Sequence, residues 1–452
     1  MKSYNPANGE LIKEYKDHSD NEVAAIINEV HDAWSAWRST TFESRAILMK
    51  NAAQVLRERK EVFAGLMTLE MGKLLRESRA EIDKCAWVCE YYAENAESML
   101  QDEVVSTDAR RSLITFQPIG VVLAVMPWNF PFWQVFRFAA PALMAGNAAV
   151  LKHASNVPGC ALAIEQVFRE AGFPAELFRA LMIPSTGVEA VISNPLVVAV
   201  TLTGSEEAGS QVASFAGRHL KKTLLELGGS DPFIILADAD LQAAVKTAVT
   251  ARMLNQGQSC IAAKRFIVAS EVADEFVGQI KQVIETLVIG NPMEAETQAG
   301  PLARPDLVDE IERQVKDSVK AGASLVLGGK RPLRPGSYFE PTLLDHVKKG
   351  MAVYNQETFG PVVVVIRAKS EEEAIEIAND SEFGLGGCVW TSDLAKGESI
   401  ARKIETGAMF VNGMTKSDPR LPFGGIKKSG YGRELGVFGI REFVNVKSIW
   451  VG

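Results

Sequence analysis

Val121-Val122-Leu123-Ala124-Val125 is the first of several short apolar runs that alternate with helix-like amphipathic stretches from about residue 112 onward. Ala148–Leu151, Ala180–Ile183 and Val197–Val200 follow it, and each is about as long as a buried strand. Alternation of this kind predicts a parallel sheet with helices on both faces. This region is therefore expected to form an α/β domain.

A second series of apolar runs shows the same alternation with helical patterns. Its members are Pro232–Leu236, Phe266–Val268, Ser324–Leu327, Val362–Ile366 and Met409–Val411. We expect them to form a second parallel sheet of comparable size. The predicted fold class is therefore α/β, with two parallel-sheet domains.

The first hundred residues carry helical patterns without strand-like runs. Ser19 and Glu22 have the spacing of a capping box, and apolar residues then recur at helical spacing from Val23 to Trp37. Further helices are expected around 47–56, with Ile47 on the apolar face, and over 77–100, with Trp87 on the apolar face.

Two segments belong to neither series. Ser112–Phe116 and Val444–Val451 are rich in β-branched residues at the edges of the predicted domains. They could pair as an exposed ribbon that adds to the sheet of another subunit. We therefore expect a homo-oligomer, either a dimer or a dimer of dimers.

The amino-acid composition disfavours some classes of function, namely nucleic-acid binding and membrane insertion. The 452 residues include 48 Lys and Arg against 56 Asp and Glu, a net charge of −8. An acidic chain of this kind disfavours nucleic acid as a partner, because phosphate neutralisation needs a basic surface. The apolar runs are too short to cross a bilayer, and the N-terminal residues do not resemble a secretory signal, so a cytoplasmic location is expected.

The five cysteines are odd in number and widely spread, which favours free thiols in a reducing compartment. Cys85 and Cys89 stand four residues apart on an expected helix, but no histidine clusters near them. We interpret the pair as packing and predict no metal site. Neither the G-x-G-x-x-G dinucleotide fingerprint after a strand nor a P-loop occurs.

Three residues could carry chemistry. Cys260 lies in a polar, glycine-containing stretch before an expected strand, which suits a nucleophile as well as a buried structural thiol. Glu226 lies in an apolar run that ends in two glycines, where a carboxylate must be functional, neutral or paired with a nearby lysine. Asn129 follows the first strand between two prolines and could either stabilise an oxyanion or form a turn.

These residues belong to an ordered set of motifs that resembles the aldehyde dehydrogenase superfamily over nearly the whole chain. The set comprises residues 126–131, Lys152, Gly204-Ser205, residues 226–229, residues 257–260, residues 357–361 and residues 422–425. Each motif is weak alone, but their order along the chain is specific.

The resemblance implies a domain organisation. A Rossmann-like cofactor-binding domain would comprise residues 1–97 and 119–228, and a catalytic domain residues 229–428. Residues 98–118 and 440–452 would form a small β oligomerisation arm.

The resemblance also implies a mechanism. Cys260 as thiolate would attack the aldehyde carbon, and the Asn129 amide with the Cys260 backbone N–H would hold the oxyanion. Hydride transfer to the nicotinamide would leave a thioester, which water attacks with Glu226 as general base. We expect backbone N–H groups and the bound nicotinamide cation to favour the thiolate.

Cofactor-binding residues follow from the same resemblance. They are Met126, Pro127, Trp128, Lys152, Ser155, Gly204, Ser205, Leu227, Glu357 and Phe359. Ser205 would contact the pyrophosphate at a helix N-terminus. Ser155 stands where many NAD-preferring members have an acid, so repulsion of a 2′-phosphate is removed and NADP is expected to be preferred, with NAD also accepted.

Substrate-binding residues are expected to be Arg137, Trp133, Ser259, Ser417 and Phe423. The succinate-semialdehyde dehydrogenases of this family carry an arginine at the position of Arg137, and a guanidinium suits a distal carboxylate. A second arginine of many such enzymes is Leu254 here, and a surface salt bridge is the alternative for Arg137. The expected reaction is therefore NAD(P)-dependent oxidation of succinate semialdehyde or a similar semialdehyde such as glutarate semialdehyde. A cysteine-dependent thioester or ester hydrolase is the alternative from another class.

Overall fold

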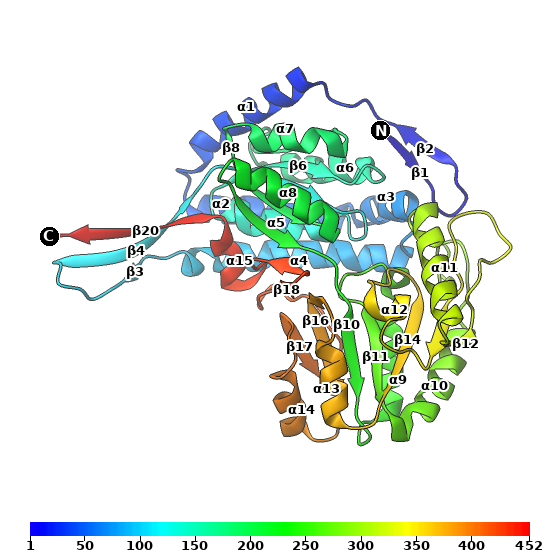
Figure 1. Ribbon diagram of the computed structural model, residues 1–452. Helices are drawn as coiled ribbons and strands as arrows, with labels where there is room; N and C mark the ends of the chain where they lie inside the picture. The colour runs from blue at the N-terminus through cyan, green and yellow to red at the C-terminus, as the bar shows by residue number, and fades with distance from the viewer.

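Two sheets built mainly of parallel strands dominate the computed structural model, which describes residues 1–452 (Figure 1). The first sheet has the strand order β19-β9-β8-β5-β6-β7. Its strands are β5 (Val121–Met126), β6 (Ala148–His153), β7 (Phe178–Ala180), β8 (Val197–Thr203), β9 (Lys222–Glu226) and β19 (Gly430–Tyr431). Only β19 runs antiparallel to its neighbour.

The second sheet has the order β12-β13-β14-β11-β10-β16-β17. Its strands are β10 (Asp231–Ile235), β11 (Ala263–Ala269), β12 (Ser324–Leu327), β13 (Thr342–Asp345), β14 (Val362–Ala368), β16 (Gly386–Trp390) and β17 (Ala408–Val411). The predicted α/β class with two such sheets is confirmed, except that β12 is an antiparallel edge strand.

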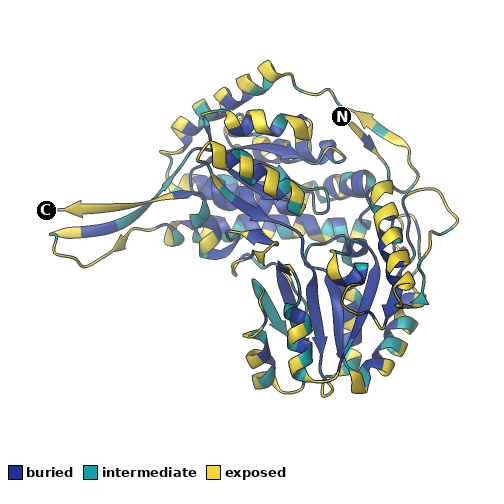
Figure 2. Ribbon diagram, viewed as in Figure 1, coloured by how far each residue is buried: buried dark blue, intermediate teal, exposed yellow.

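Helices cover both faces of each sheet, which buries the strands on both sides (Figure 2). Along β10, Phe233 and Ile235 pack in the cluster that includes α9 and α10, whereas Ile234 packs in the cluster that includes α13 and α14. Because both faces of the strand are buried, the run Pro232–Ile235 is apolar without alternation, and the buried Asp231 at its start is the exception.

The helices of the first half are α1 (Asp20–Trp37), α2 (Phe42–Glu58), α3 (Lys60–Met71), α4 (Leu75–Met99), α5 (Trp133–Met144), α6 (Pro158–Glu170), α7 (Val188–Ser193) and α8 (Glu206–Arg218). Those of the second half are α9 (Leu241–Met253), α10 (Ser270–Glu285), α11 (Pro305–Lys320), α12 (Ala352–Asn355), α13 (Glu371–Asn379), α14 (Leu394–Ala401) and α15 (Gly436–Glu442). Short 3-10 helices occupy Ser185–Gly187 (η1) and Leu254–Gly257 (η2). None of the helices is both long and apolar enough to span a bilayer.

The predicted N-terminal helices are present, and the Ser19 and Glu22 capping box forms at the start of α1. Two residues that were assigned to apolar helix faces lie at the surface instead, since Ile47 on α2 is 56% exposed and Trp87 on α4 is 37% exposed. The strand predicted at 180–183 lies earlier in the chain, as β7 covers Phe178–Ala180, and the Met182 carbonyl beyond it accepts a hydrogen bond from the His18 N–H.

A three-stranded ribbon projects from the body (Figure 1). It consists of β3 (Glu103–Val104), β4 (Arg111–Pro118) and β20 (Val444–Val451). The antiparallel pairing of β4 with β20 runs from Arg111 and Val451 to Pro118 and Val444, so the predicted pairing of these two segments is confirmed.

Two small strand pairs complete the fold, namely β1 (Lys2–Tyr4) with β2 (Leu11–Glu14), and β15 (Phe383–Gly384) with β18 (Ile426–Lys427). Residue Glu226 ends β9 in the first sheet, and β10 of the second sheet begins only five residues later, at Asp231. The segment that connects the two sheets is therefore short. The late strand β19 pairs with β9 and so holds the end of the first sheet next to this segment.

Candidate active site

Two cavities meet at Cys260. One, of about 360 Å³, is lined by α4, α5, the Cys260 loop and residues 414–423, and we call it the helix-side cavity. The other, of about 340 Å³, lies at the carboxyl ends of β5, β8 and β9, and we call it the strand-end cavity. Cys260 is the single residue that lines both. A ligand in either cavity can therefore reach the same sulfur atom.

The sequence-predicted residues are divided between the two cavities. All of those expected to bind substrate line the helix-side cavity, namely Trp133, Arg137, Ser259, Ser417 and Phe423. Most of those expected to bind cofactor line the strand-end cavity, namely Pro127, Trp128, Gly204, Ser205, Leu227, Glu357 and Phe359. Met126, Lys152 and Ser155 line neither cavity.

The turn before Cys260 has an unusual backbone. Asn255 and Gln256 have φ of 52° and 58°, and Gly257 has φ of 74°. A Cβ on Gly257 would collide with the Gly360 carbonyl, so only glycine fits there. The Asn255 amide stabilises the turn by donating to the carbonyls of Asn129, at 2.7 Å, and of Gln258, at 3.1 Å. The turn is thereby tied to the loop that follows β5.

Lys264 at the start of β11 also holds the Cys260 loop. Its Nζ donates to the carbonyls of Ser259, at 2.8 Å, and Cys260, at 2.7 Å. It also forms an ion pair with Glu357 at 3.3 Å, and Glu357 in turn accepts a hydrogen bond from the Gly229 N–H at 2.9 Å. One buried lysine therefore joins the thiol loop to the strand-end cavity.

Burial raises the pKa of the Cys260 thiol to about 12, and the charges of Arg137 and Lys264 act in the opposite direction. Desolvation therefore favours the neutral thiol in the protein without cofactor, and the expected contribution of backbone N–H groups to the thiolate stays a prediction. The effect of a bound nicotinamide cation stays a prediction.

Glu226 is buried at the end of β9, and neither of its carboxylate oxygens has a hydrogen-bond partner. Burial, followed by the nearby Glu434 carboxylate, raises its pKa well above the usual value, against the opposing charges of Arg137 and Arg433. A Cβ on Gly424 would lie 2.7 Å from Glu226 Oε1, so only a glycine leaves room for this side chain. Glu226 lines neither cavity in this conformation. The alternative of a salt bridge with Lys221 or Lys222 does not occur, because those lysines bind other groups.

Asn129 lies between the β5 strand end and the Cys260 loop. One N–H of its side-chain amide donates to the Gln258 carbonyl at 3.1 Å, which leaves the second N–H available to a ligand. Its Oδ1 is buried without a partner. The side chain lines the strand-end cavity beside Cys260.

Ser205 is the N-cap of α8, and its hydroxyl accepts a hydrogen bond from the Ala208 N–H. The predicted helix start after β8 is thus confirmed. Lys152, in β6, is 6% exposed, and burial lowers the pKa of its ammonium group. Ser155 is exposed in the turn between β6 and α6, a few residues beyond Lys152.

Arg137 on α5 is 2% exposed and forms an ion pair with the buried Glu434. Its guanidinium also donates to Thr203 Oγ1 at 3.4 Å and lies 4.6 Å from the centre of the Phe423 ring. Arg137 therefore does form a salt bridge, as the alternative interpretation proposed. The ion pair is buried at the cavity wall, however, and does not lie on a helix surface.

The comparisons with known proteins decide the family. The model of the aldehyde dehydrogenase family matches residues 1–449.

The chain belongs to the aldehyde dehydrogenase family.

Similar proteins cover almost the full chain. A probable succinate-semialdehyde dehydrogenase (NADP+) of Synechocystis is 52% identical over 447 residues, which span 99% of this chain and 98% of that protein. Succinate-semialdehyde dehydrogenase (NADP+) 1 of Mycobacterium tuberculosis is 50% identical over 450 residues, with the same coverage. The crystal structure of succinic semialdehyde dehydrogenase from Streptococcus pyogenes with NADP+ has a TM-score of 0.98 and 40% identity, and covers 100% of this chain and 99% of that one.

Sequence reasoning missed three residues of this aldehyde dehydrogenase site, namely Lys264, Glu434 and Lys84. A lysine inside the strand Ala263–Ala269 could have been noticed, since a buried ammonium needs partners. Glu434 and Lys84 gave no such signal, because they approach the site from α15's preceding loop and from α4, far from Cys260 in sequence.

Proposed function

We propose that this aldehyde dehydrogenase oxidises succinate semialdehyde to succinate, with NADP+ preferred over NAD+, through a covalent adduct on Cys260. The observation that carries the proposal is the position of Cys260 as the only residue shared by the two cavities. The names of the similar proteins from Synechocystis and Mycobacterium tuberculosis support this substrate and this cofactor.

The first step is addition of the Cys260 sulfur to the aldehyde carbon, in which the S–H bond breaks and its proton passes to solvent while the carbon–sulfur bond forms. The charge that develops on the aldehyde oxygen is stabilised by the free N–H of the Asn129 amide and by the Cys260 backbone N–H. The resulting thiohemiacetal holds the substrate carbon at the junction of the cavities.

The nicotinamide ring supplies, when bound, the acceptor for the hydride that leaves this carbon. Residues of the strand-end cavity fit such a group. Trp128 and Phe359 lie edge to face with their ring centres 5.8 Å apart, and the Glu357 carboxylate is held by Lys264 beside them. Ser205 at the α8 N-terminus is suited to a pyrophosphate, because helix N–H groups attract anions.

The 2′-phosphate of NADP+ is assigned to Lys152 and Ser155. Lys152 forms no ion pair with an acidic residue, although its ammonium is buried. A phosphate would supply the missing counter-charge, and Ser155 presents a hydroxyl where an acid would repel it.

The second half of the reaction is hydrolysis of the thioester on Cys260. Glu226 takes a proton from the attacking water, which then adds to the acyl carbon and releases succinate and the thiol. Its unpartnered carboxylate is available for this role, but the side chain must rotate towards the thiol. Gly228 and Gly229, which follow it, give the backbone this freedom.

The same proposal assigns the larger units. Residues 1–97 and 119–228 hold the cofactor, residues 229–428 carry the thiol, and residues 98–118 with 440–452 join copies of the chain in a dimer or a dimer of dimers. The exposed apolar side chains of the ribbon support the last assignment, among them Val104, at 75% exposure, and Trp450, at 61%.

The experiment compares succinate semialdehyde with butanal, a neutral aldehyde of equal length, using NADP+ and NAD+ as alternatives. We expect the highest kcat/KM with succinate semialdehyde and NADP+, and no turnover by Cys260→Ala. A preference for butanal would contradict the substrate assignment. Ester cleavage by the native chain with no dinucleotide binding would favour the hydrolase alternative.

A further inference from the structure

Several cationic side chains line the helix-side cavity, but most of them already bind another group of the protein or face the solvent. Arg137 is paired with Glu434, and Arg76 donates to the Thr297 carbonyl at 2.6 Å. Lys416 is exposed to solvent. Lys84 on α4 is the exception, because it faces the cavity without an ion pair to any acidic residue.

The surroundings of Lys84 hold its ammonium group in one place. Nζ donates to the hydroxyl of the buried Ser417 at 2.7 Å and lies 4.2 Å from the centre of the Trp133 ring. An ammonium group has three N–H donors, so two remain free. Because Trp133 and Ser417 both line the cavity, these donors are placed for an anion inside it.

The charges that face Lys84 favour an additional anion. Burial lowers the pKa of its ammonium group to about 8, and Arg137 on α5 contributes in the same direction. Cys85 and Glu81 on α4 and Asp418 in the loop oppose this shift only weakly. A bound carboxylate would place a full negative charge beside the Lys84 ammonium group. It would also form charge-assisted hydrogen bonds with that group.

We propose that Lys84, with Ser417 as its hydrogen-bond partner, binds the distal carboxylate of the substrate and so sets the preference for acid-bearing over neutral aldehydes. The inference rests on the proposed function. It adds Lys84 to Arg137, which pairs with Glu434 through Nε and also lines the cavity, so that two cationic groups face the same space.

The test measures KM and kcat of Lys84→Met with succinate semialdehyde and with butanal. Loss of a charge-assisted hydrogen bond should raise KM for the semialdehyde about 10- to 100-fold, with kcat changed little. KM for butanal should stay within about twofold, which also shows that the variant is folded. Lys84→Arg, which keeps the charge, should recover part of the semialdehyde affinity.

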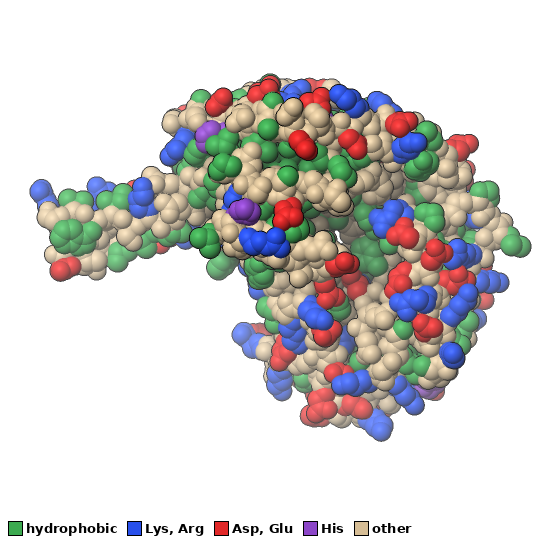
Figure 3. All heavy atoms as spheres, turned by 45° about the horizontal axis from the view of Figure 1, so that its top comes forward, with side chains coloured by type: hydrophobic (Ala, Val, Ile, Leu, Met, Phe, Trp, Pro, Cys, Tyr) green, Lys and Arg blue, Asp and Glu red, His purple; other side chains and the backbone are tan.

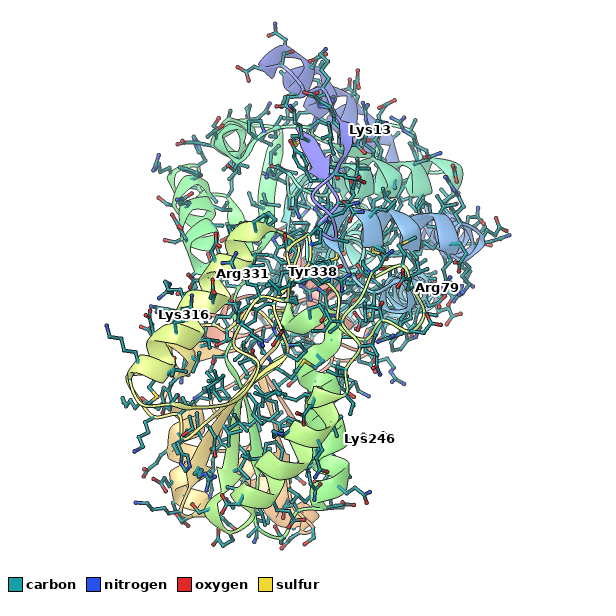
Figure 4. The ribbon with its side chains drawn as sticks, turned by 90° about the vertical axis from the view of Figure 1, so that its right-hand side faces the viewer. Lys13, Arg79, Lys246, Lys316, Arg331 and Tyr338 are labelled. Atoms are coloured by element: carbon teal, nitrogen blue, oxygen red, sulfur yellow. The ribbon has the colours of Figure 1, made fainter.

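Arg79→Met is the matched control. It removes a cation from the outer face of α4, where Arg79 pairs with Glu61 at the surface of the molecule (Figure 4). Both substrates should be unaffected. A Lys84→Met enzyme that keeps the native KM for succinate semialdehyde would overturn the inference and leave the proposed function intact, whereas a native enzyme that prefers butanal would remove the proposed function itself.

A pH profile gives a second readout that a purely structural lysine would not produce. The kcat/KM of the native enzyme for succinate semialdehyde should fall above about pH 8 as Lys84 loses its proton, relative to that for butanal. In Lys84→Arg this relative fall should disappear, because guanidinium stays charged. An identical ratio of the two substrates from pH 7 to 9.5 in the native enzyme would contradict the assignment.

Discussion

Desolvation controls the acid–base chemistry of individual site residues. It raises the pKa of both Cys260 and Glu226, so in the unliganded protein the nucleophile and the base are both biased towards their protonated forms. A neutral thiol is a much weaker nucleophile than its thiolate, and a protonated carboxyl group cannot act as a general base. Activation is therefore expected only when substrate and cofactor fill the cavities and change the local electrostatics.

The role of Glu226 predicts a separation of the two half-reactions. In Glu226→Gln the acylation of Cys260 should still release one equivalent of NADPH per site in a rapid burst, whereas steady-state turnover should fall about 10²- to 10⁴-fold. Stopped-flow absorbance of NADPH measures both phases. Cys260→Ala, the control, should show neither phase, and a Glu226→Gln enzyme with native steady-state turnover would show that another group activates the water.

The pH dependence of the same step has a definite sign. Because burial and Glu434 raise the pKa of Glu226 well above the usual carboxylate value, the basic form gains population at higher pH than it would for an ordinary glutamate. The deacylation rate of the native enzyme should therefore increase with pH, and the residual rate of Glu226→Gln should lack this rise.

Ser155 predicts the choice of dinucleotide. In Ser155→Glu the new carboxylate should repel the 2′-phosphate by about 1 kcal/mol or more per charge at an exposed position. The ratio of kcat/KM with NADP+ to that with NAD+ should fall at least about tenfold. Ser155→Ala, which adds no charge, should keep the NADP+ preference, and an unchanged ratio in Ser155→Glu would remove Ser155 from the cofactor assignment.

At the scale of elements, the strands of the first sheet were largely visible in the sequence because they are buried on both faces and uniformly apolar. In the second sheet, β13 and β16 were not predicted, since Thr342–Asp345 is short and Gly386-Gly387-Cys388 lacks large side chains. In a single sequence, two adjacent glycines indicate a turn rather than a strand, and only the neighbouring strands in the structure show otherwise.

The candidate site was predictable to a similar degree. Cys260 and Asn129 lie in local turns with recognisable composition, so short-range patterns and family resemblance located them. The pairing of Arg137 with Glu434 and the position of Lys84 depend on contacts between distant segments. Such contacts have no signature in a single sequence.

His153 connects two of these elements and predicts a pH-dependent stability. It ends β6, and its Nε2 lies 2.9 Å from the Pro131 carbonyl, while its Nδ1 accepts a hydrogen bond from the Ala154 N–H at 2.9 Å. Nδ1 also lies 3.2 Å from the Met126 carbonyl, and burial lowers the pKa of the ring to about 4 although both carbonyl contacts oppose this shift. His153 therefore links the end of β6 to the loop 126–131, which carries Asn129, and desolvation disfavours its protonated form.

The sign of the effect follows from the lowered pKa. The stabilisation is complete above pH 6.5 and is lost as pH falls towards 4, because the unfolded chain then binds the extra proton. Between pH 7.5 and 4.5, native protein should lose about 2 to 3 kcal/mol more unfolding free energy than His153→Gln. Urea unfolding at the two pH values measures this difference. His219→Gln, at an exposed histidine, is the control and should follow the native protein; equal losses in native and His153→Gln proteins would refute the role of His153.

At the scale of the whole molecule, the ribbon of β3, β4 and β20 is the feature that the single chain does not explain. It extends away from the body and carries hydrophobic side chains along its surface, whereas charges of both signs intermingle over the lower part of the molecule (Figure 3). Val446 and Trp450 lie on one face of β20, because alternate residues of a strand share a face, and they are 59% and 61% exposed. A ribbon of so few strands is marginally stable by itself, so these side chains are expected to be covered by another copy of the chain.

This expectation predicts the assembly of a two-residue variant. Native protein should have the mass of a dimer or a dimer of dimers by light scattering after size-exclusion chromatography, whereas Val446→Asp/Trp450→Asp should shift towards the 49.1 kDa of one chain. The reason is that burying two carboxylates in an apolar interface costs far more free energy than the apolar contacts of the interface contribute. Asn445→Asp/Lys447→Asp, which adds acids at polar positions of the opposite face, should keep more of the native assembly. A native mass of 49.1 kDa, or a Val446→Asp/Trp450→Asp variant with unchanged mass, would exclude this face of the ribbon as the contact between copies.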